Sequence, residues 1–335
     1  MGPAANRSDF GRGPRLTGPA IGVVAFLVTL CLTPLVIVMA TRLGIVDRPG
    51  ALKPQSRPVP YLGGVAVFAS LAVGIAVGHP MLIAPVAAAL CLGVADDRFD
   101  LSALFRLVGQ IAVGAVVVAT CPVHLPGGLA IISIIAVTVV VINGVNLIDG
   151  LDLLAAGVTA VAGVGFALIL HGTARQVAIA LTAALAGFLI YNRPPARVYL
   201  GDGGSYLLGA TLSVLLVEAW RPGVPEHVGV AALALVAVPV AEITCAVVRR
   251  TRSHRSWTAG DRGHPYDRLV ALGWPPTSAS LAYIGTEALL AAGVVVAVHQ
   301  QSMKASVGLD IVAAALLVVA AAATGALHPD RESRR

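Results

Sequence analysis

Apolar stretches recur along nearly the whole chain and restrict what it can fold into. Of its 335 residues, 57% are hydrophobic and 12% are charged, with a mean hydropathy of +0.86. A helix needs about 20 mostly apolar residues to cross a bilayer. We expect apolar helices over residues 18–41, 62–78, 80–95, 106–120, 127–142, 153–171, 175–191, 203–218, 229–248, 280–298 and 308–327. The sequence therefore predicts an all-α polytopic membrane protein with 10–11 transmembrane helices.

We expect one packed domain between two short tails. Residues 1–17 are rich in Gly, Pro and Arg, which is typical of a disordered N-terminal tail. Residues 18–327 form a single transmembrane domain, and residues 328–335 form a short cytoplasmic tail. The first apolar stretch is longer than the core of a signal peptide and continues into a basic loop, so cleavage is not expected.

The distribution of Lys and Arg predicts the orientation in the membrane. With the N-terminus outside and the C-terminus inside, 17 of the 23 basic residues fall on the inner side. The inner segments are then 42–61, 96–105, 143–152, 192–202, 249–279 and the C-terminal tail, and Arg106 at the start of a helix is counted with them. Because the basic residues follow this membrane pattern, the net charge of +6 does not indicate a nucleic-acid partner. We expect a multi-pass protein of the plasma membrane.

The paired Asp, Asn–Asp and Gly–Asp clusters all lie in these inner segments. A transporter or flippase for an anionic or lipid-linked solute is the alternative, and it should carry ionisable residues near the bilayer centre and internal repeats. Glu242 and Glu287 are the obvious carboxylates within the apolar stretches, and no duplicated motif is visible. The pattern therefore favours an enzyme whose active site lies on cytoplasmic loops.

The stretch from Asn192 to Gly209 contains the most informative motif. Asp202 is flanked by Gly201 and by Gly203 at the start of an expected helix. There a carboxylate can hold a divalent cation, while bare backbone amides face an anion. Asp202 acting only as the helix N-cap is the alternative. Glycine on both sides favours a turn that faces a ligand.

Adjacent carboxylates at Asp96 and Asp97 follow an apolar stretch. Neighbouring negative charges raise one pKa of the pair unless a cation relieves them. The pair is a candidate general base, or it contributes to metal binding. The alternative is a solvated loop with Arg98 as the counter-ion.

Asn143, Asn146, Asp149 and Asp152 recur at every third position. At near-helical pitch these four polar groups share one stripe, with apolar residues on the other faces. Without Lys or Arg among them, they need a cation, a ligand or water. An ordinary polar loop with Asn-Gly and Asp-Gly turns is the alternative.

Two basic loops complete the inner side. In residues 47–64, prolines stiffen a loop that carries Arg48, Lys53 and Arg57, which suits phosphate groups, and the Gly63–Gly64 pair permits close backbone approach. Positive-inside bias alone explains these charges equally well.

The loop over residues 249–269 mixes both signs of charge with aromatic residues, including His264, Tyr266 and Arg268. We expect it to form a substrate-binding lid, with contact to anionic lipid as the alternative. Its histidines lack zinc-ligand spacing and no Cys is nearby.

Four motifs in order resemble the polyprenyl-phosphate N-acetylhexosamine-1-phosphate transferases. The motifs are R-P-V-P…G-G, D-D-R-F-D-L…R-L-V-G-Q, N-G-V-N-L-I-D-G-L-D and N-R-P-P-A-R-V-Y-L-G-D-G-G-S. The resemblance implies transfer of a sugar-1-phosphate from a UDP-sugar to a polyprenyl phosphate, with release of UMP. The product initiates cell-envelope glycan synthesis. The CDP-alcohol phosphotransferases share diphosphate chemistry, but their spaced acidic motif is missing here.

The resemblance also implies partners and a cofactor. The expected donor is a UDP-N-acetylhexosamine or related UDP-amino sugar, and the acceptor is undecaprenyl or decaprenyl phosphate. Mg²⁺ is the expected ion, with Mn²⁺ as the alternative. Membrane lipid surrounds the protein, and a homodimer is expected.

The resemblance implies roles for residues at matching positions. Asp202 matches a metal ligand of the family and Asp149 matches a catalytic acidic position, and we expect both to bind the metal ion. Asp96 and Asp97 match the pair that deprotonates or orients the lipid phosphate. All four are therefore the expected catalytic residues.

The expected substrate-binding residues lie around the nucleotide. Tyr199 matches the ring that stacks on uracil, Asn192 and Asp152 match pocket positions, and Lys53 matches a nearby basic residue. We assign Asn143, Asn146, His264 and Arg268 to substrate binding as well.

The chain departs from the family pattern in its last large inner loop. The usual D-x-x-H-x-H-H reads D-R-G-H-P-Y-D here, with Tyr266 and Asp267 replacing the second and third His. Leu153 also stands where Gly is usual. The changed loop resembles a variant found in relatives that transfer other amino sugars, and the helix count favours the wall-glycan or O-antigen branch of the family.

Overall fold

The computed structural model describes residues 17–48, 57–76, 80–121, 128–253 and 263–327. Residues 1–16 of the expected N-terminal tail, the C-terminal tail 328–335 and Lys53 lie outside the described residues.

The described chain is almost entirely helical, which confirms the predicted all-α class. The helices are α1 (Gly18–Arg42), α2 (Gly63–Ala76), α3 (Ile83–Phe99, after the 3₁₀ turn η1, Pro80–Leu82), α4 (Ala103–Thr120), α5 (Gly128–Ile148), α6 (Leu154–Ile169), α7 (Gly172–Asn192), α8 (Gly201–Glu218), α9 (Glu226–Ala232), α10 (Ala237–Arg252), α11 (Pro265–Ala271), α12 (Pro276–His299) and α13 (Met303–Ala323). Ten of the eleven expected apolar ranges each overlap one of these helices. The range 229–248 differs, because the 3₁₀ turn η2 (Leu233–Val236) divides it into α9 and α10.

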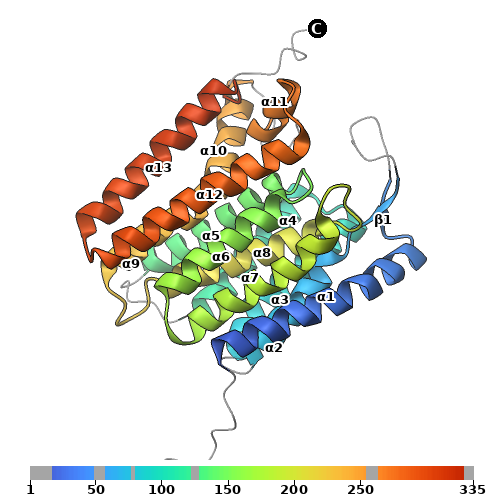
Figure 1. The fold of residues 1–335 in the computed structure, drawn as a ribbon, viewed down its shortest axis with the longest axis horizontal. Coiled ribbons are helices and arrows are strands. Elements are labelled where there is room, and N and C mark those ends of the chain that lie inside the picture. Colours follow the sequence, from blue (N-terminus) through green and yellow to red (C-terminus); the bar gives the residue numbers. More distant parts are fainter. Residues whose placement is uncertain (1–16, 49–56, 77–79, 122–127, 254–262, 328–335) are drawn as a thin grey trace, which may run out of the picture.

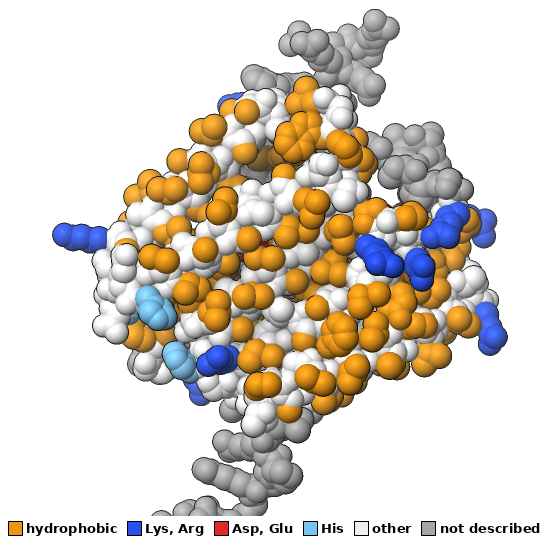
Figure 2. All heavy atoms as spheres, in the orientation of Figure 1, with side chains coloured by type: hydrophobic (Ala, Val, Ile, Leu, Met, Phe, Trp, Pro, Cys, Tyr) orange, Lys and Arg blue, Asp and Glu red, His pale blue; other side chains and the backbone are white. Residues whose placement is uncertain are grey.

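Helices long and apolar enough to cross a bilayer form most of the described bundle. Eight spans meet both conditions, while α2 and α6 are apolar but shorter. The eight are α1, η1–α3, α4, α5, α7, α9–α10, α12 and α13. Figure 2 shows one face of the bundle covered with hydrophobic side chains, while Lys and Arg lie towards its margins. This surface suits lipid, so the structure is that of a multi-pass membrane protein.

Helix α8 lies at the centre of the bundle (Figure 1), against α2, α3 and α5. All of its residues from Gly203 to Glu218 are buried. Close packing against α2 requires glycine on both sides: a Cβ on Gly64 would lie 2.4 Å from the Cα of Gly204. Small residues let membrane helices approach in this way. The expected close approach at Gly63–Gly64 is confirmed.

A short hairpin, absent from the sequence-based prediction, covers one end of α8. Strands β1 (Val46–Asp47) and β2 (Val59–Pro60) pair antiparallel. The segment after β2 then bonds to the chain entering α8: Tyr199 N donates to Pro60 O at 2.8 Å, and Gly63 N donates to Tyr199 O at 2.9 Å. The hairpin thereby fixes the backbone of Tyr199.

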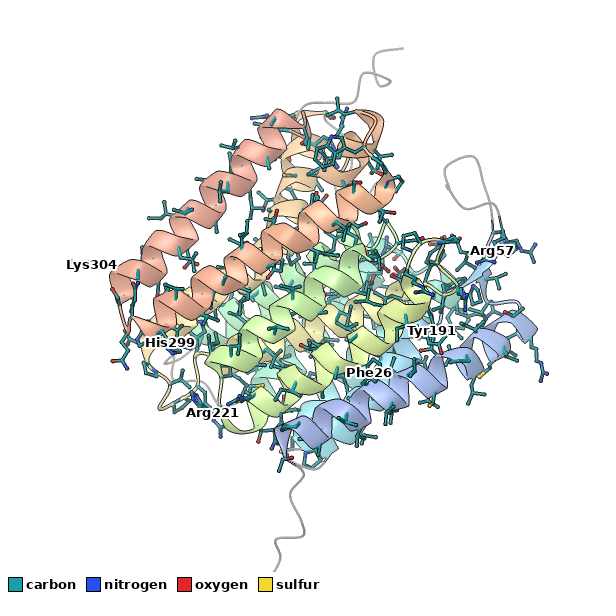
Figure 3. All side chains as sticks on the ribbon, viewed as in Figure 1. Phe26, Arg57, Tyr191, Arg221, His299 and Lys304 are labelled. Atoms are coloured by element: carbon teal, nitrogen blue, oxygen red, sulfur yellow. The ribbon has the colours of Figure 1, made fainter. Side chains whose placement is uncertain are left out.

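Polar side chains lie at both ends of the bundle. Figure 3 shows Arg57 and Tyr191 towards one end, while Arg221, His299 and Lys304 lie at the other. The first end also carries the beginning of α8. This division is the one expected from the distribution of basic residues.

Candidate functional site

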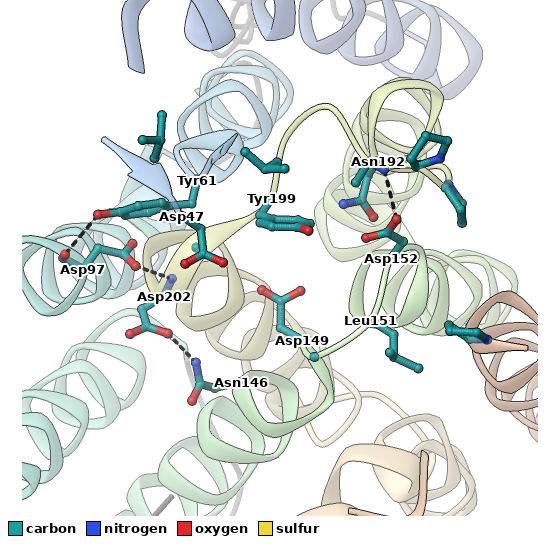
Figure 4. A pocket seen from close by; sticks show the side chains of 18 of the residues that line it. Asp47, Tyr61, Asp97, Asn146, Asp149, Leu151, Asp152, Asn192, Tyr199 and Asp202 are labelled. Carbon is teal, nitrogen blue, oxygen red and sulfur yellow. Dashed lines mark hydrogen bonds between the residues drawn. The ribbon is translucent and has the colours of Figure 1, made fainter. Parts of the chain in front are cut away.

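A cavity of about 1070 Å³ opens at the end of the bundle where α8 begins. Eight of the expected site residues line it: Asp96, Asp97, Asn146, Asp149, Asp152, Asn192, Tyr199 and Asp202. They come from α3, α5, α7, α8, the turn between α5 and α6, and the segment between α7 and α8. Figure 4 shows several of these side chains around one space. The fold therefore collects carboxylates that are more than 100 residues apart in the chain.

Asp97 closes the N-terminus of α8. Its Oδ1 accepts a hydrogen bond from Asp202 N and its Oδ2 accepts one from Gly203 N, both at 3.0 Å. The first amides of a helix have no partner within the helix, so a carboxylate there satisfies them and complements the helix dipole. Asp202 itself lies in the first turn, after the N-cap Leu200. The alternative in which Asp202 is the N-cap is therefore wrong.

Asp96 is buried and hydrogen-bonded through both oxygens. Oδ2 accepts from the Tyr206 hydroxyl at 2.7 Å, and Oδ1 accepts from Leu101 N at 3.1 Å. Arg106 Nη1 lies 3.6 Å from Oδ2. The counter-ion of this pair is thus Arg106, while Arg98 lies over the ring of Phe99.

Asn146 holds the Asp202 carboxylate in place. Its Nδ2 donates to Asp202 Oδ1 at 2.7 Å and to Ser205 Oγ at 3.0 Å (Figure 4). The structure places Asn143 elsewhere, because its amide donates to Gln110 Oε1 on α4, outside the cavity.

Asp149 and Asp152 lie beyond the end of α5, which stops at Ile148. The predicted helical stripe is therefore correct for the two Asn and wrong for the two Asp. Among the described residues, none donates a hydrogen bond to the Asp149 carboxylate. Burial, followed by the charges of Asp202, Asp97 and Asp152, raises the pKa of Asp149 well above its usual value. Burial also raises the pKa of Asp152, against the hydrogen bond from Ala196 N.

Asn192 ties the turn after α5 to the segment that enters α8. Its Oδ1 accepts from Leu153 N and its Nδ2 donates to Val198 O, both at 2.9 Å. Leu153 adopts a left-handed conformation, with φ +70°, which a glycine would adopt without strain.

Tyr199 lies half-buried in the cavity wall. Burial, with a smaller effect from Asp152, raises its pKa to about 12. The ring is therefore neutral at physiological pH and presents an uncharged aromatic surface to the cavity.

The other expected residues that the structure describes do not line the cavity. His264 is buried, with Nδ1 2.8 Å from Glu242 Oε1. Arg268 lies on α11. Sequence reasoning did not single out Asp47 and Tyr61, which line the cavity because of the β1–β2 hairpin. Only two residues pair on each strand, too few for a periodic signal.

The donor set fits a magnesium ion that shares its ligands with a substrate. Among the described residues, no three His, Cys, Asp or Glu side chains converge closely enough to hold a metal by themselves. Mg²⁺ keeps several waters and commonly takes one or two carboxylates plus substrate phosphates. Asp149, a half-buried carboxylate without a hydrogen-bond donor, faces the same cavity as Asp202 (Figure 4). A cation between them would relieve the repulsion between the two carboxylates, which adds to the effect of burial in raising the pKa of Asp149.

A carboxylate-lined cavity at one end of an apolar helical bundle defines an integral-membrane protein with a polar ligand site at its membrane boundary. Residues 79–219 match the model of glycosyl transferase family 4. The chain is 31% identical over 278 residues to a probable undecaprenyl-phosphate N-acetylglucosaminyl 1-phosphate transferase of Bacillus subtilis, covering 75% of this chain and 76% of the relative.

Two further relatives have related names. A decaprenyl-phosphate N-acetylglucosaminephosphotransferase of Mycolicibacterium smegmatis is 28% identical over 319 residues, or 79% of both chains. The undecaprenyl-phosphate alpha-N-acetylglucosaminyl 1-phosphate transferase of Escherichia coli is 27% identical over 280 residues, or 76% of both chains. The chain belongs to glycosyl transferase family 4, which confirms the resemblance found in its motifs.

Proposed function

We propose that this protein transfers an N-acetylhexosamine-1-phosphate from a UDP-sugar to a polyprenyl phosphate. UMP is released, and the polyprenyl-diphosphate sugar initiates a cell-envelope glycan. The observation that carries the proposal is the meeting of Asp149 and Asp202 in one cavity, in a chain whose relatives are named for this reaction.

The reaction exchanges one phosphoanhydride bond for another. A phosphate oxygen of the lipid attacks the sugar-bearing phosphorus of the donor. The bond from that phosphorus to the bridging oxygen breaks, and UMP leaves with the bond's electron pair. Asp149 and Asp202 would hold Mg²⁺, or Mn²⁺ in its place, and the ion would supply positive charge that offsets the repulsion between the two anionic substrates.

The chain's own residues position these groups. Asn146 orients Asp202 through its hydrogen bond to Oδ1. Asp97 fixes the first turn of α8, on which Asp202 lies. The neutral ring of Tyr199 suits stacking on uracil, and Arg57 in the cavity wall attracts the donor phosphates.

The distribution of charge supports a cytoplasmic site. The sequence segments that flank the cavity carry most of the basic residues, so the positive-inside rule favours a cytoplasmic position for this end, with the N-terminus outside and the C-terminus inside. There the nucleotide arrives from water while the lipid phosphate reaches the site from within the membrane.

Purified protein supplied with polyprenyl phosphate, Mg²⁺ and a panel of UDP-amino sugars tests the proposal. We expect UMP release that requires the lipid and the metal. Asp202→Asn should abolish release while the protein remains folded and extractable. Glu226→Gln, which changes an exposed carboxylate at the start of α9, is the matched control and should retain wild-type activity. Robust turnover by the Asp202 variant would refute the site.

A further inference from the structure

Tyr266 contacts the last turn of α5, just before the turn that carries Asp149. It is the second residue of α11 and its side chain is buried. Its hydroxyl donates a hydrogen bond to Leu147 O at 3.0 Å. Leu147 lies in the last turn of α5, where carbonyls have no helical partner. Tyr266 therefore caps the end of α5 two residues before Asp149.

The same ring packs on the residue that follows Asp149. A Cβ on Gly150 would lie 2.2 Å from the Tyr266 hydroxyl oxygen and 2.7 Å from Cζ. Only a residue without a side chain leaves room for the ring at this distance. Tyr266 thus contacts the backbone on both sides of Asp149.

A buried network holds Tyr266 itself. Its ring stacks on His264, with centroids 5.4 Å apart and planes 5° apart, and meets Tyr283 edge-on at 6.3 Å. Both rings are tied to Glu242: His264 Nδ1 lies 2.8 Å from Oε1, and the Tyr283 hydroxyl donates to Oε2 at 3.0 Å. Glu242 is on α10 and Tyr283 on α12, so three segments fix the ring. A fully bonded buried network of this kind is rigid.

We infer that Tyr266 is a positioning residue that holds the Asp149 carboxylate at the reaction site, with Glu242, His264 and Tyr283 as its support. The inference deepens the proposed function and rests on it for the role of Asp149. It assigns a task to the part of the last inner loop that does not line the cavity.

Tyr266→Phe removes only the hydroxyl and gives the first test. The turnover number should fall about 3- to 10-fold, the effect of one lost hydrogen bond, while the KM for the UDP-sugar changes little. The Mg²⁺ concentration for half-maximal rate should rise. Amide hydrogen exchange of the full-length protein in detergent should accelerate in residues 146–153 and remain unchanged elsewhere.

Tyr191→Phe is the matched control, because the Tyr191 hydroxyl also donates to a backbone carbonyl at 3.0 Å, that of Leu30. This variant should leave turnover and the exchange of residues 146–153 at wild-type values. Equal effects of the two variants, or unchanged local exchange in Tyr266→Phe, would overturn the inference.

A double-mutant cycle between Gly150 and Tyr266 tests the inference through the Tm, so it needs no measurement of enzyme activity. Gly150→Ala should lower the Tm of the wild-type background by several degrees, because its Cβ collides with the ring. In a Tyr266→Ala background the same change should have little further effect. Additive losses would overturn the inference. A wild-type protein that folds but transfers no sugar phosphate would instead refute the proposed function, and these exchange and Tm results would still measure the contact.

Discussion

Gly93→Ala should push α3 and α8, two of the helices that form the site, apart. Gly93 lies on α3 where it crosses the start of α8. A Cβ at this position would lie 2.2 Å from Asp202 O and 2.6 Å from the Cα of Gly203. Both contacts are backbone atoms, which cannot rotate away as a side chain could. Ordinary contacts begin at 3.4 Å, so α3 has to retreat by about 1 Å.

The size of the effect follows from that displacement. Overpacking of a close contact costs about 1–3 kcal/mol, and the gain in helix propensity from Gly to Ala returns at most about 1 kcal/mol. The larger effect is on activity, because the movement carries Asp97 away from the amides of Asp202 and Gly203. A misplacement of about 1 Å in a catalytic site costs on the order of 100-fold in rate.

Thermal unfolding in detergent and UMP release measure the two effects on the same preparation. Gly285→Ala is the control, since its Cβ meets nothing within 4 Å on α12. It should keep full activity and unfold at the same or a slightly higher temperature. Wild-type activity in Gly93→Ala would refute the close contact between α3 and α8 on which the geometry of the site depends.

Two further outcomes follow from the turn after α5. Leu153 has φ +70°, a conformation that costs a residue with a side chain about 1–2 kcal/mol. The Leu153→Gly variant should therefore unfold at a higher temperature than the Leu153→Ala variant, which is the reverse of the usual order of Gly and Ala in helices. A lower unfolding temperature for the Gly variant would contradict this reasoning. Burial and then Asp202, Asp97 and Asp152 raise the pKa of Asp149, so its ionised form destabilises the metal-free fold. The Tm in EDTA should consequently fall as the pH rises above about 4, the value near which an unfolded Asp ionises. Asp149→Asn should flatten this dependence and added Mg²⁺ should restore stability at neutral pH, whereas identical pH curves for the two proteins would contradict the shift.

The helices could be predicted because their apolar lengths match a bilayer. The break inside the range 229–248 could not, although Pro239 lies in the first turn of α10, a position that proline favours. Pro34 lies within α1, which continues through it to Arg42. A proline in a membrane helix therefore does not by itself tell where the helix ends.

The composition of the site was visible in the sequence, but its contacts were not. The three-residue spacing identified Asn146 and Asp149, and the flanking glycines identified Asp202; these three residues do meet in the cavity. Asn143 belongs to the same repeat and turns instead to Gln110 on another helix. Asp97 had the appearance of a base, yet it bonds to amides 105 and 106 residues away. Such partners come from tertiary packing, for which local spacing carries no signal.

The identity of the released nucleotide tests the central claim most directly. Protein incubated with polyprenyl phosphate, Mg²⁺ and the accepted UDP-sugar should yield UMP and a lipid that carries a diphosphate and the sugar, in equal amounts by mass spectrometry. Release of UDP with a lipid monophosphate sugar would contradict the account, because the attack would then fall on the sugar carbon rather than on phosphorus.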